Sequence, residues 1–542
     1  MANCKKLGVL MDCSRNGVAT VSNVKKMIDL IAPMGYNALQ LYMEDVFEVE
    51  NQPYFGYLRG RYTKEELKEI DRYGLEKGVE VMPSMQTLAH LSNIFHWETY
   101  LDMQDINGIL LIDDPKTYRF IEDMLSTLSE CFTSRNIHIN MDEAFLVGYG
   151  KYRRLHGIPD QYNLLCHHLR KVLEICNKYG FKPMMASDMF FTALGKSGDI
   201  FDNYYDGEFR LKEELKTLVP KEVSLVYWDY GILDEKGFVQ GIKNHKQFNN
   251  HIIYYAGAMT WYGFVPNNGY SLRTNEIAAK HCLEYGIDES YITLWGDNGK
   301  ECSSYAALPN IYAYAQFMRG NFDMADIKRG FKEMFGIPFD EFMYLDLPNQ
   351  VNEKPVIYNN PHKYFFYSDV FLGQTDCLAH EGFGAKMKEN AEKLDKWSSH
   401  PDFGYIFRSE ASLCRVLEYK CELGLKTRKA YQSGDKAALK NLAENDYVIL
   451  GERIRQFYKD FKALWDKENK PYGFEIQDAR FGGLIMRIDS CRECLNDYVN
   501  GKIDCIPELE EKILDFLGGV DKYDPEQTQI HTWGRIISAS PI

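Results

Sequence analysis

Two adjacent carboxylates, Asp142 and Glu143, lie in a stretch of sequence, NIHINMDEAF (136–145), in which apolar and polar residues alternate. In an extended strand successive side chains point to opposite faces of the sheet. One face of such a strand would then carry His138, Asn140 and Asp142. Imidazole, amide and carboxylate groups can donate, accept or stabilise charge, so this strand end is the first candidate site.

Similar residues recur where other short apolar segments end. Tryptophan occurs at three successive ends, and carboxylates occur at several. The candidates, in chain order, are Arg15, Glu44 and Asp45, His90, Asp142 and Glu143, Asp188, Trp228 and Asp229, Trp261 and Tyr262, and Trp295 and Asp297. Indole walls with a few polar groups are typical of ligand sites and suit sugars, which have C–H faces and hydroxyl edges. For Asp188 or Asp229 alone, a helix cap or an ion pair is the simpler interpretation.

Eight apolar segments alternate with amphipathic helical patterns in the first part of the chain. The expected strands are 7–13, 38–44, 79–85, 136–143, 182–189, 224–230, 252–261 and 291–298. Eight such units predict an α/β fold, a (β/α)8 TIM barrel, whose active site lies at the carboxyl ends of the strands. A doubly wound open sheet is less favoured, because DCSRNG follows the first strand in place of a glycine-rich phosphate turn.

Strand signals stop near residue 320, and the rest of the chain is expected to be helical. The predicted helices lie near 380–396, 409–433, 436–465 and 478–500. We therefore predict a catalytic barrel over 1–325 and an all-α C-terminal domain over 326–542. Structural support or dimerisation is the favoured role for the second domain.

Composition excludes several classes of function. The 542 residues carry a formal net charge of -15, which argues against nucleic acid or an anionic membrane surface as the main partner. The 13 cysteines are scattered, and the close pair Cys491 and Cys494 has no second pair to complete a zinc site. We find no signal peptide and no apolar stretch of about 18 residues. These features predict a cytoplasmic protein without a metal or a cofactor.

The run HINMDEA resembles the signature of glycoside hydrolase family 20, the β-N-acetylhexosaminidases, in which a histidine, a spacer, a glycine and any residue precede Asp-Glu. SRN with Arg15, QTLAHL with His90, and LWGDNG with Trp295 and Asp297 are also similar to that family. The resemblance covers about residues 5–320. It is closest to the bacterial, apparently intracellular branch in which helices follow the barrel. Asn140 stands where the family usually has glycine.

The resemblance implies a role for each carboxylate of the pair. Glu143 would protonate the leaving oxygen and then activate water, while Asp142 would orient the substrate's 2-acetamido group and stabilise the charge that develops. The acetamido oxygen would attack the anomeric carbon to give an oxazolinium intermediate. Neighbours in sequence point in different directions, so this pair is poorly suited to flank one bond as the two carboxylates of most retaining glycosidases do.

The resemblance also implies roles for the surrounding residues. Tyr262, with Tyr255 and Tyr227 as rivals, would donate to the acetamido oxygen, and His138 would be a buried supporting histidine. Glu44 or Asp45 would hold His90. The residues expected to enclose or clamp the sugar are Arg15, Trp228, Trp261, Trp295 and Asp297, and Asp188 is counted among the substrate-binding candidates.

The predicted function is an exo-acting, retaining β-N-acetylhexosaminidase that releases terminal β-GlcNAc or β-GalNAc, and the expected assembly is a homodimer. Two alternatives remain open at this point. One is a glycosidase of another barrel family, with Glu143 as the acid and Asp188 or Asp297 as a protein nucleophile. The other is a non-catalytic amino-sugar binding protein.

Overall fold

The computed structural model describes residues 4–196, 201–350, 359–379, 381–519 and 528–541, which fall into two compact units. The barrel unit comprises Met1–Ala258, Ser271–Leu294 and Asn310–Ile327. The helical unit comprises Met259–Tyr270, Trp295–Pro309 and Lys328–Ile542. The division differs from a single cut at 325/326, because two segments that follow barrel strands belong to the helical unit.

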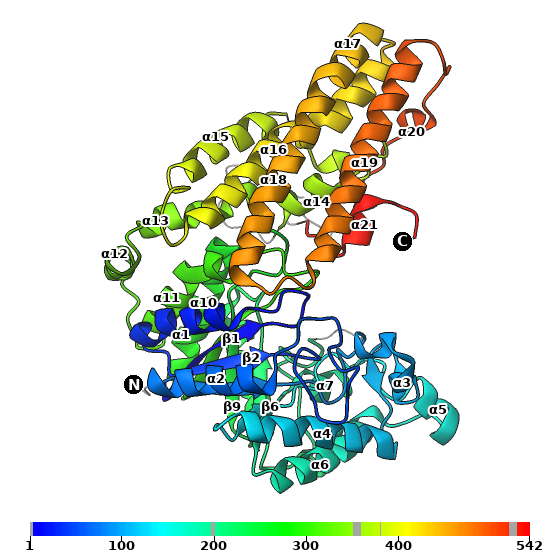
Figure 1. The fold of residues 1–542 in the computed structure, drawn as a ribbon. Coiled ribbons are helices and arrows are strands. Elements are labelled where there is room, and N and C mark those ends of the chain that lie inside the picture. Colours follow the sequence, from blue (N-terminus) through cyan, green and yellow to red (C-terminus); the bar gives the residue numbers. More distant parts are fainter. Residues whose placement is uncertain (1–3, 197–200, 351–358, 380, 520–527, 542) are drawn as a thin grey trace. The chain divides into compact units, whose positions relative to one another are not determined.

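The barrel unit contains a closed barrel of eight strands (Figure 1), which confirms the predicted fold class. The strands are β1 (Lys6–Asp12), β2 (Ala38–Tyr42), β3 (Glu80–Ser84), β6 (Asn136–His138), β7 (Lys182–Ala186), β8 (Ser224–Trp228), β9 (Ile252–Gly257) and β10 (Glu289–Leu294). Their order around the barrel is β1-β10-β9-β8-β7-β6-β3-β2, and the neighbouring pairs are parallel. All eight expected strands are therefore present, several of them shorter than predicted.

Helices connect the strands, as a parallel barrel requires. The longer ones are α1 (Val21–Met34), α2 (Lys64–Glu76), α4 (Pro115–Cys131), α6 (Gln161–Lys178), α9 (Glu235–Lys246), α10 (Asn268–Glu284) and α11 (Leu308–Phe317). Short elements interrupt the loops, namely η1 (Ile94–His96), α3 (Glu98–Leu101), β4 (Gln104–Ile106), β5 (Ile109–Leu110), α5 (Lys151–His156), α7 (Asp188–Thr192), α8 (Glu213–Lys216) and η2 (Ser304–Ala307). The sequence did not predict the small β4–β5 hairpin.

The barrel interior is filled by close packing that includes buried polar groups. Gly8 leaves room for the Tyr291 ring, since a Cβ atom at Gly8 would lie 2.1 Å from that ring. The buried Tyr255 hydroxyl donates to Gln40 and lies 3.3 Å from Nδ1 of His138. The Tyr255 hydroxyl and the Gln40 side chain thus satisfy each other, which lowers the cost of burying them. Tyr255 is thus a core residue, and His138 is the buried supporting histidine that the sequence indicated.

The helical unit is all-α, which confirms the second part of the predicted fold class. Its elements are α12 (Met324–Phe335, which begins in the barrel unit), α13 (Phe339–Phe342), η3 (Met343–Asn349), α14 (Pro361–Tyr367), η4 (Asp376–Leu378), α15 (Phe383–Asp395), α16 (Gly404–Gln432), α17 (Lys436–Asn441), the π-helix η5 (Leu442–Asp446), α18 (Tyr447–Glu468), α19 (Phe474–Val499), α20 (Pro507–Glu510) and α21 (Trp533–Ile537). Within the described residues no helix is both long and apolar enough to cross a membrane.

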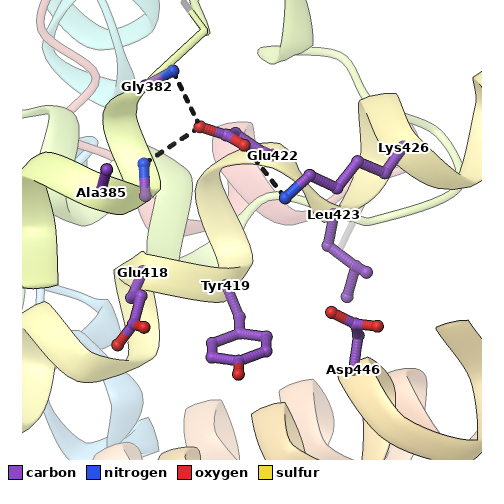
Figure 2. A pocket seen from close by; sticks show the side chains of 9 residues that line it. Gly382, Ala385, Glu418, Tyr419, Glu422, Leu423, Lys426 and Asp446 are labelled. Atoms are coloured by element: carbon purple, nitrogen blue, oxygen red, sulfur yellow. Dashed lines mark hydrogen bonds and ion pairs between the residues drawn. The ribbon is translucent and has the colours of Figure 1, made fainter.

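A pocket of about 400 Å³ opens beside α15 and α16 of the helical unit (Figure 2). Glu422 occupies one side of it and accepts hydrogen bonds from the backbone N–H groups of Gly382 and Gly384, both at 3.1 Å. Its other oxygen pairs with Lys426 at 3.1 Å. Glu422 therefore serves as a cap for the start of α15, and the pocket contains none of the site residues predicted from the sequence.

Candidate active site

His90 lies between the two adjacent carboxylates. Its Nε2 atom is 3.3 Å from Oδ2 of Asp142 and 3.3 Å from Oε2 of Glu143. Burial opposes protonation of the imidazole, yet Asp142 and Glu143 raise the pKa of His90 well above its ordinary value. At neutral pH the site therefore holds an imidazolium next to the Asp142 carboxylate and within 3.3 Å of Glu143.

Asp142 is held in its charged form. Burial opposes ionisation, but His90 and a hydrogen bond from Gln86 together keep the pKa of Asp142 well below its usual range. Nε2 of Gln86 donates to Oδ1 of Asp142 at 3.0 Å and to the Tyr42 hydroxyl at 2.9 Å. Gln86 follows β3 by two residues, and the sequence analysis did not single it out. Glu143, by contrast, has a side chain that is 39% exposed, so it is accessible to a substrate.

Arg15, after β1, is joined to Glu44, after β2. Nε of Arg15 donates to Oε1 of Glu44 at 3.0 Å, and the Tyr42 hydroxyl donates to the same oxygen at 3.0 Å. The neighbouring Asp45 pairs with Arg59 at 3.0 Å. In the described residues, then, the hydrogen bonds of Glu44 and Asp45 go to these groups and not to His90, which is held by Asp142 and Glu143 instead.

Asp188 is fully buried at the start of α7 and contacts the backbone of Glu143. Its Oδ2 atom accepts a hydrogen bond of 2.9 Å from the backbone N–H of Glu143. Burial, reinforced by the charge of Asp142, raises the pKa of Asp188 to about 8. Asp188 is therefore a neutral acid at neutral pH that contacts the backbone of the strand end, a contact that the sequence did not foresee.

Family models match both parts of the chain. The model described as "Glycosyl hydrolase family 20, catalytic domain" matches residues 7–194, and the "Glycoside Hydrolase 20C C-terminal domain" matches residues 340–528. Together they cover more than half of the sequence, and the matched barrel segment contains His90, Asp142 and Glu143. The chain belongs to glycoside hydrolase family 20.

Individual relatives are more distant. A chitooligosaccharidolytic beta-N-acetylglucosaminidase of Ostrinia furnacalis is 27% identical over 25% of this chain and 26% of its own length. A beta-hexosaminidase of Vibrio furnissii is 25% identical over 26% of this chain and 29% of its own length. Hexosaminidase D of Bos taurus is 25% identical over 39% of this chain and 59% of its own length. The chain thus spans between about a quarter and three fifths of the length of these relatives.

Solved structures of the family also align with the chain. A chitobiase of Flavobacterium johnsoniae is 14% identical, with a TM-score of 0.46 over 99% of this chain and 78% of the other. An exo beta-N-acetylglucosaminidase of Vibrio harveyi is 14% identical, with a TM-score of 0.46 over 62% of this chain and 59% of the other.

Asn140, which replaces the usual glycine of family 20, adopts a left-handed backbone conformation. Its φ is 55°, and Met141 and Glu143 also have positive φ values of 72° and 52°. Glycine adopts this conformation without strain, and asparagine is among the few other residues that tolerate it. The Asn140 amide donates to Oγ of Ser84 at 3.1 Å and to the Met85 carbonyl at 2.7 Å. The substitution thus keeps the turn and adds two bonds to the end of β3.

Trp228 ends β8 in the barrel unit, and Asp229 is the residue that follows. The Trp228 ring lies 5.5 Å from that of Phe201 and stacks on Tyr230, also at 5.5 Å. Oδ1 of Asp229 accepts from the backbone N–H groups of Gly231 and Ile232, at 2.8 and 3.2 Å. Burial raises the pKa of Asp229 to about 6. Asp229 therefore caps a turn, whereas the sequence suggested a helix cap or an ion pair as its simpler interpretation.

Tyr227, one of the rival tyrosines, is buried in the barrel unit and stacks on His245 with ring centroids 4.2 Å apart. Tyr262 and Trp261 lie in Met259–Tyr270, four to five residues beyond the end of β9, and belong to the helical unit. The ring of Tyr262 is 4.3 Å from that of His531 and 5.5 Å from that of Trp261. The role predicted for Tyr262 at the acetamido oxygen stays a prediction.

Trp295 and Asp297 directly follow β10 and also belong to the helical unit. The Thr260 hydroxyl donates to the Trp295 carbonyl at 2.8 Å and so joins the two loop segments of that unit. The segment is further held through Glu301, whose carboxylate pairs with Lys363 at 2.9 Å and Arg480 at 2.8 Å. The helices α14 and α19 thus fix the loop that carries Asp297.

No cluster of three or more histidine, cysteine or acidic side chains suited to a metal ion occurs in the part of the chain that the structure describes. All 13 cysteines are free thiols, including Cys491 and Cys494.

Proposed function

We propose that this protein is an exo-acting, retaining β-N-acetylhexosaminidase that uses the 2-acetamido oxygen of its substrate as the nucleophile. Membership of family 20 supports a glycoside hydrolase, and the names of the relatives point to terminal N-acetylhexosamine residues as substrates. The observation that carries the mechanism is the shared histidine, since Nε2 of His90 lies 3.3 Å from a carboxylate oxygen of both Asp142 and Glu143.

The proposed reaction begins with an aligned acetamido group. The Asp142 carboxylate accepts a hydrogen bond from the acetamido N–H, and the acetamido oxygen attacks C1 of the sugar. Glu143 donates its proton to the glycosidic oxygen as the bond from C1 to that oxygen breaks. The positive charge of the oxazolinium ion is stabilised by Asp142, which has to remain ionised. Glu143, now a carboxylate, removes a proton from the water that attacks C1 and restores the β configuration.

His90 is a positioning residue in this scheme. Its positive charge keeps Asp142 ionised and orients the carboxyl group of Glu143. Arg15, fixed by the buried Glu44, is the candidate for binding the hydroxyls of the terminal sugar. Trp228 is proposed as a further contact of the sugar. For Trp261, Trp295 and Asp297, sugar binding stays a prediction from the sequence, as does the dead-end pocket that exo action requires.

A protein nucleophile is less well supported. Asp188, the barrel candidate, is fully buried, is protonated at neutral pH and accepts the N–H of Glu143. A neutral carboxyl group cannot attack the anomeric carbon. These properties favour the substrate's own oxygen over Asp188 as the nucleophile.

Substitution of each carboxylate tests the proposal with a 4-methylumbelliferyl β-N-acetylglucosaminide assay. Glu143→Gln is expected to lower kcat by about 10²- to 10⁴-fold through loss of the general acid and base. Asp142→Asn removes the charge that faces the oxazolinium ion and should also lower kcat strongly. Glu65→Gln, an exposed carboxylate on α2, is the control. Activity of Glu143→Gln within twofold of the wild type would contradict the proposal.

A cytoplasmic location and a homodimer complete the proposal. The free state of all 13 cysteines supports a reducing compartment. Sedimentation velocity tests the dimer, for which we expect twice the 63.0 kDa mass of one chain.

A further inference from the structure

His90 and Glu143, whose side chains lie 3.3 Å apart, share an unusual backbone conformation. Both have a φ of 52°, in the left-handed region that residues other than glycine rarely adopt. A residue persists in this strained conformation only where the surrounding structure holds its backbone firmly. The contacts of the two chain segments that carry His90 and Glu143 therefore decide whether the two side chains meet.

The small β4–β5 hairpin holds the segment that carries His90. The backbone N–H of Leu110, on β5, donates to the Leu88 carbonyl at 2.8 Å. On the other side of His90, the Leu91 N–H donates at 3.1 Å to the carbonyl of Gly108, in the turn of the hairpin. Two backbone hydrogen bonds with the hairpin thus bracket His90.

The same hairpin holds the segment that follows Glu143, through the side chain of Asp105 on β4. Oδ2 of Asp105 accepts a hydrogen bond from the Gly148 N–H at 2.7 Å, and Oδ1 accepts one from the Tyr152 N–H at 2.7 Å. Asp105 is only 7% exposed, so these bonds are largely shielded from water and would be costly to lose. Both oxygens of one carboxylate are thus committed to the chain that leads away from Glu143.

The segment after Glu143 also passes very close to β4. A Cβ atom at Gly150 would lie 2.1 Å from the carbonyl oxygen of Asp105, so this approach requires glycine. Nearer to Glu143, Nε2 of Gln161 on α6 donates to the Phe145 carbonyl at 2.9 Å. The segment between Glu143 and α5 is therefore held by α6 near its start and by β4 near its end.

We propose that the β4–β5 hairpin positions Glu143 against His90, and that Asp105 is the residue through which it does so. The inference rests on the proposed function, in which Glu143 protonates the leaving oxygen. Asp105 is a positioning residue, because it acts through the backbone that follows Glu143 and does not touch the substrate. Displacement of a catalytic group by about 1 Å can lower a rate about 100-fold, so the loss of this anchor should be visible in the chemistry.

The dependence of the rate on the leaving group tests Asp105, because an acid matters most when the leaving group is poor. We compare kcat/KM for phenyl and 2,4-dinitrophenyl β-N-acetylglucosaminide, since phenolate needs a proton to leave and dinitrophenolate does not. Asp105→Ala is expected to lower kcat/KM about 30-fold for the phenyl substrate and at most about threefold for the dinitrophenyl substrate. Asp105→Asn keeps one acceptor oxygen and should fall between Asp105→Ala and the wild type.

Asp71 on α2 provides the matched control, because it is also a buried aspartate that holds backbone next to β6, but before the strand begins. Its carboxylate accepts from the N–H and from the hydroxyl of Thr133, each at 3.2 Å, and it is 4% exposed. Asp71→Ala should lower the melting temperature but keep the ratio of the two kcat/KM values within about twofold of the wild type. An equal loss on both substrates in Asp105→Ala, or the same change of ratio in Asp71→Ala, would overturn the proposal.

An NMR titration of the His90 imidazole separates a failure of this inference from a failure of the proposed function, because it needs no turnover. The contact with Glu143 is one of those that raise the pKa of His90. Displacement of Glu143 in Asp105→Ala or Asp105→Asn should therefore lower the pKa of His90, and Asp71→Ala should leave it unchanged. A lowered pKa in a protein that cleaves neither glycoside would support the role of the hairpin and contradict only the hydrolase proposal. An unchanged pKa of His90 in both Asp105 variants would contradict the inference itself.

Discussion

At the scale of single residues, the three neighbouring carboxyl groups of the site differ in burial and in their charged and hydrogen-bonding partners. Asp142 is kept ionised by His90 and Gln86, Glu143 is partly exposed, and Asp188 is kept neutral by burial. A neutral Asp188 can accept the Glu143 N–H without placing another negative charge beside Asp142. Environments that drive pKa values apart in this way are typical of acid–base sites.

Asp188 should therefore limit activity and stability at alkaline pH. Its pKa is raised from 3.8 to about 8 in the folded protein, so the folded state binds a proton that the unfolded chain releases near pH 4. The free energy of unfolding should consequently fall as the pH rises from about 4 to about 8. Above pH 8, ionised Asp188 would face Asp142, Glu143 and Tyr204, and kcat should fall.

Asp188→Asn preserves the acceptor for the Glu143 N–H and cannot ionise. We expect it to retain kcat above pH 8 and to gain melting temperature relative to the wild type as the pH rises from 5 to 8. Asp188→Ala removes the acceptor and should lower kcat at every pH with little change in KM. If kcat falls equally above pH 8 in the wild type and in Asp188→Asn, this role of Asp188 is contradicted.

At the scale of elements, the eight strands and the C-terminal helices were predictable, but the path of the chain at the site was not. Strand β6 ends at His138, five residues before the predicted end, because Asn140 and Met141 have left-handed φ values. Alternation of polar and apolar residues continues through this turn and hides it. Asn140 was identified from the sequence as the unusual position, yet its bonds to Ser84 and Met85 depend on the neighbouring strand β3.

Substitutions at Asn140 should separate the backbone requirement from the hydrogen bonds. Asn140→Gly keeps the turn and loses both side-chain bonds, whereas Asn140→Ala loses the bonds and adds the cost of the left-handed conformation. We expect Asn140→Ala to be about 1 kcal/mol less stable than Asn140→Gly in urea unfolding. Alanine that equals or exceeds glycine in stability would show that the positive φ is not required.

Roles that depend on tertiary partners were also beyond the sequence. Gln86 begins the QTLAHL segment that was noted only for His90, and Arg59 has no distinguishing pattern around it. The importance of both follows from the carboxylates that they contact. The predicted bond from Glu44 or Asp45 to His90 is replaced by Arg15 and Arg59 pairs, because each of these carboxylates has an arginine within reach. The periodicity of apolar residues predicts approximately where the strands lie. It does not predict which of several nearby charged side chains a carboxylate will pair with.

At the scale of the whole molecule, two segments after barrel strands belong to the helical unit. Phe264 packs on Phe457 at 5.1 Å and on Phe461 at 5.3 Å, and His362 accepts the Phe264 N–H at 2.9 Å. Oε1 of Glu468 accepts from the Ser303 hydroxyl at 2.5 Å. The helical region thus carries structural partners of the segments that hold Trp261 and Asp297, a role consistent with the predicted support function.

The buried ion cluster of this unit should be sensitive to the loss of one charge. Lys363 and Glu301 both have side chains with 0% exposure. Lys363→Met leaves Glu301 with one cationic partner fewer and should destabilise the helical unit by about 3–5 kcal/mol. The double variant Lys363→Met/Glu301→Gln also removes the carboxylate that Lys363 neutralises, so its loss of stability in urea unfolding should be smaller than the sum of the two single losses. A double variant at least as unstable as the sum of the single variants would contradict the account.

The central claim is that the nucleophile belongs to the substrate, and a comparison of two aryl glycosides tests it most directly. The ratio of kcat/KM for 4-methylumbelliferyl β-N-acetylglucosaminide and the corresponding β-glucoside isolates the 2-acetamido group, since the leaving group is the same. The acetamido substrate should be hydrolysed with a kcat/KM at least about 10³ times that of the β-glucoside. This ratio corresponds to a loss of more than about 4 kcal/mol of transition-state stabilisation when the acetamido group is absent. Comparable values for the two substrates would contradict it and would assign the nucleophile to the protein.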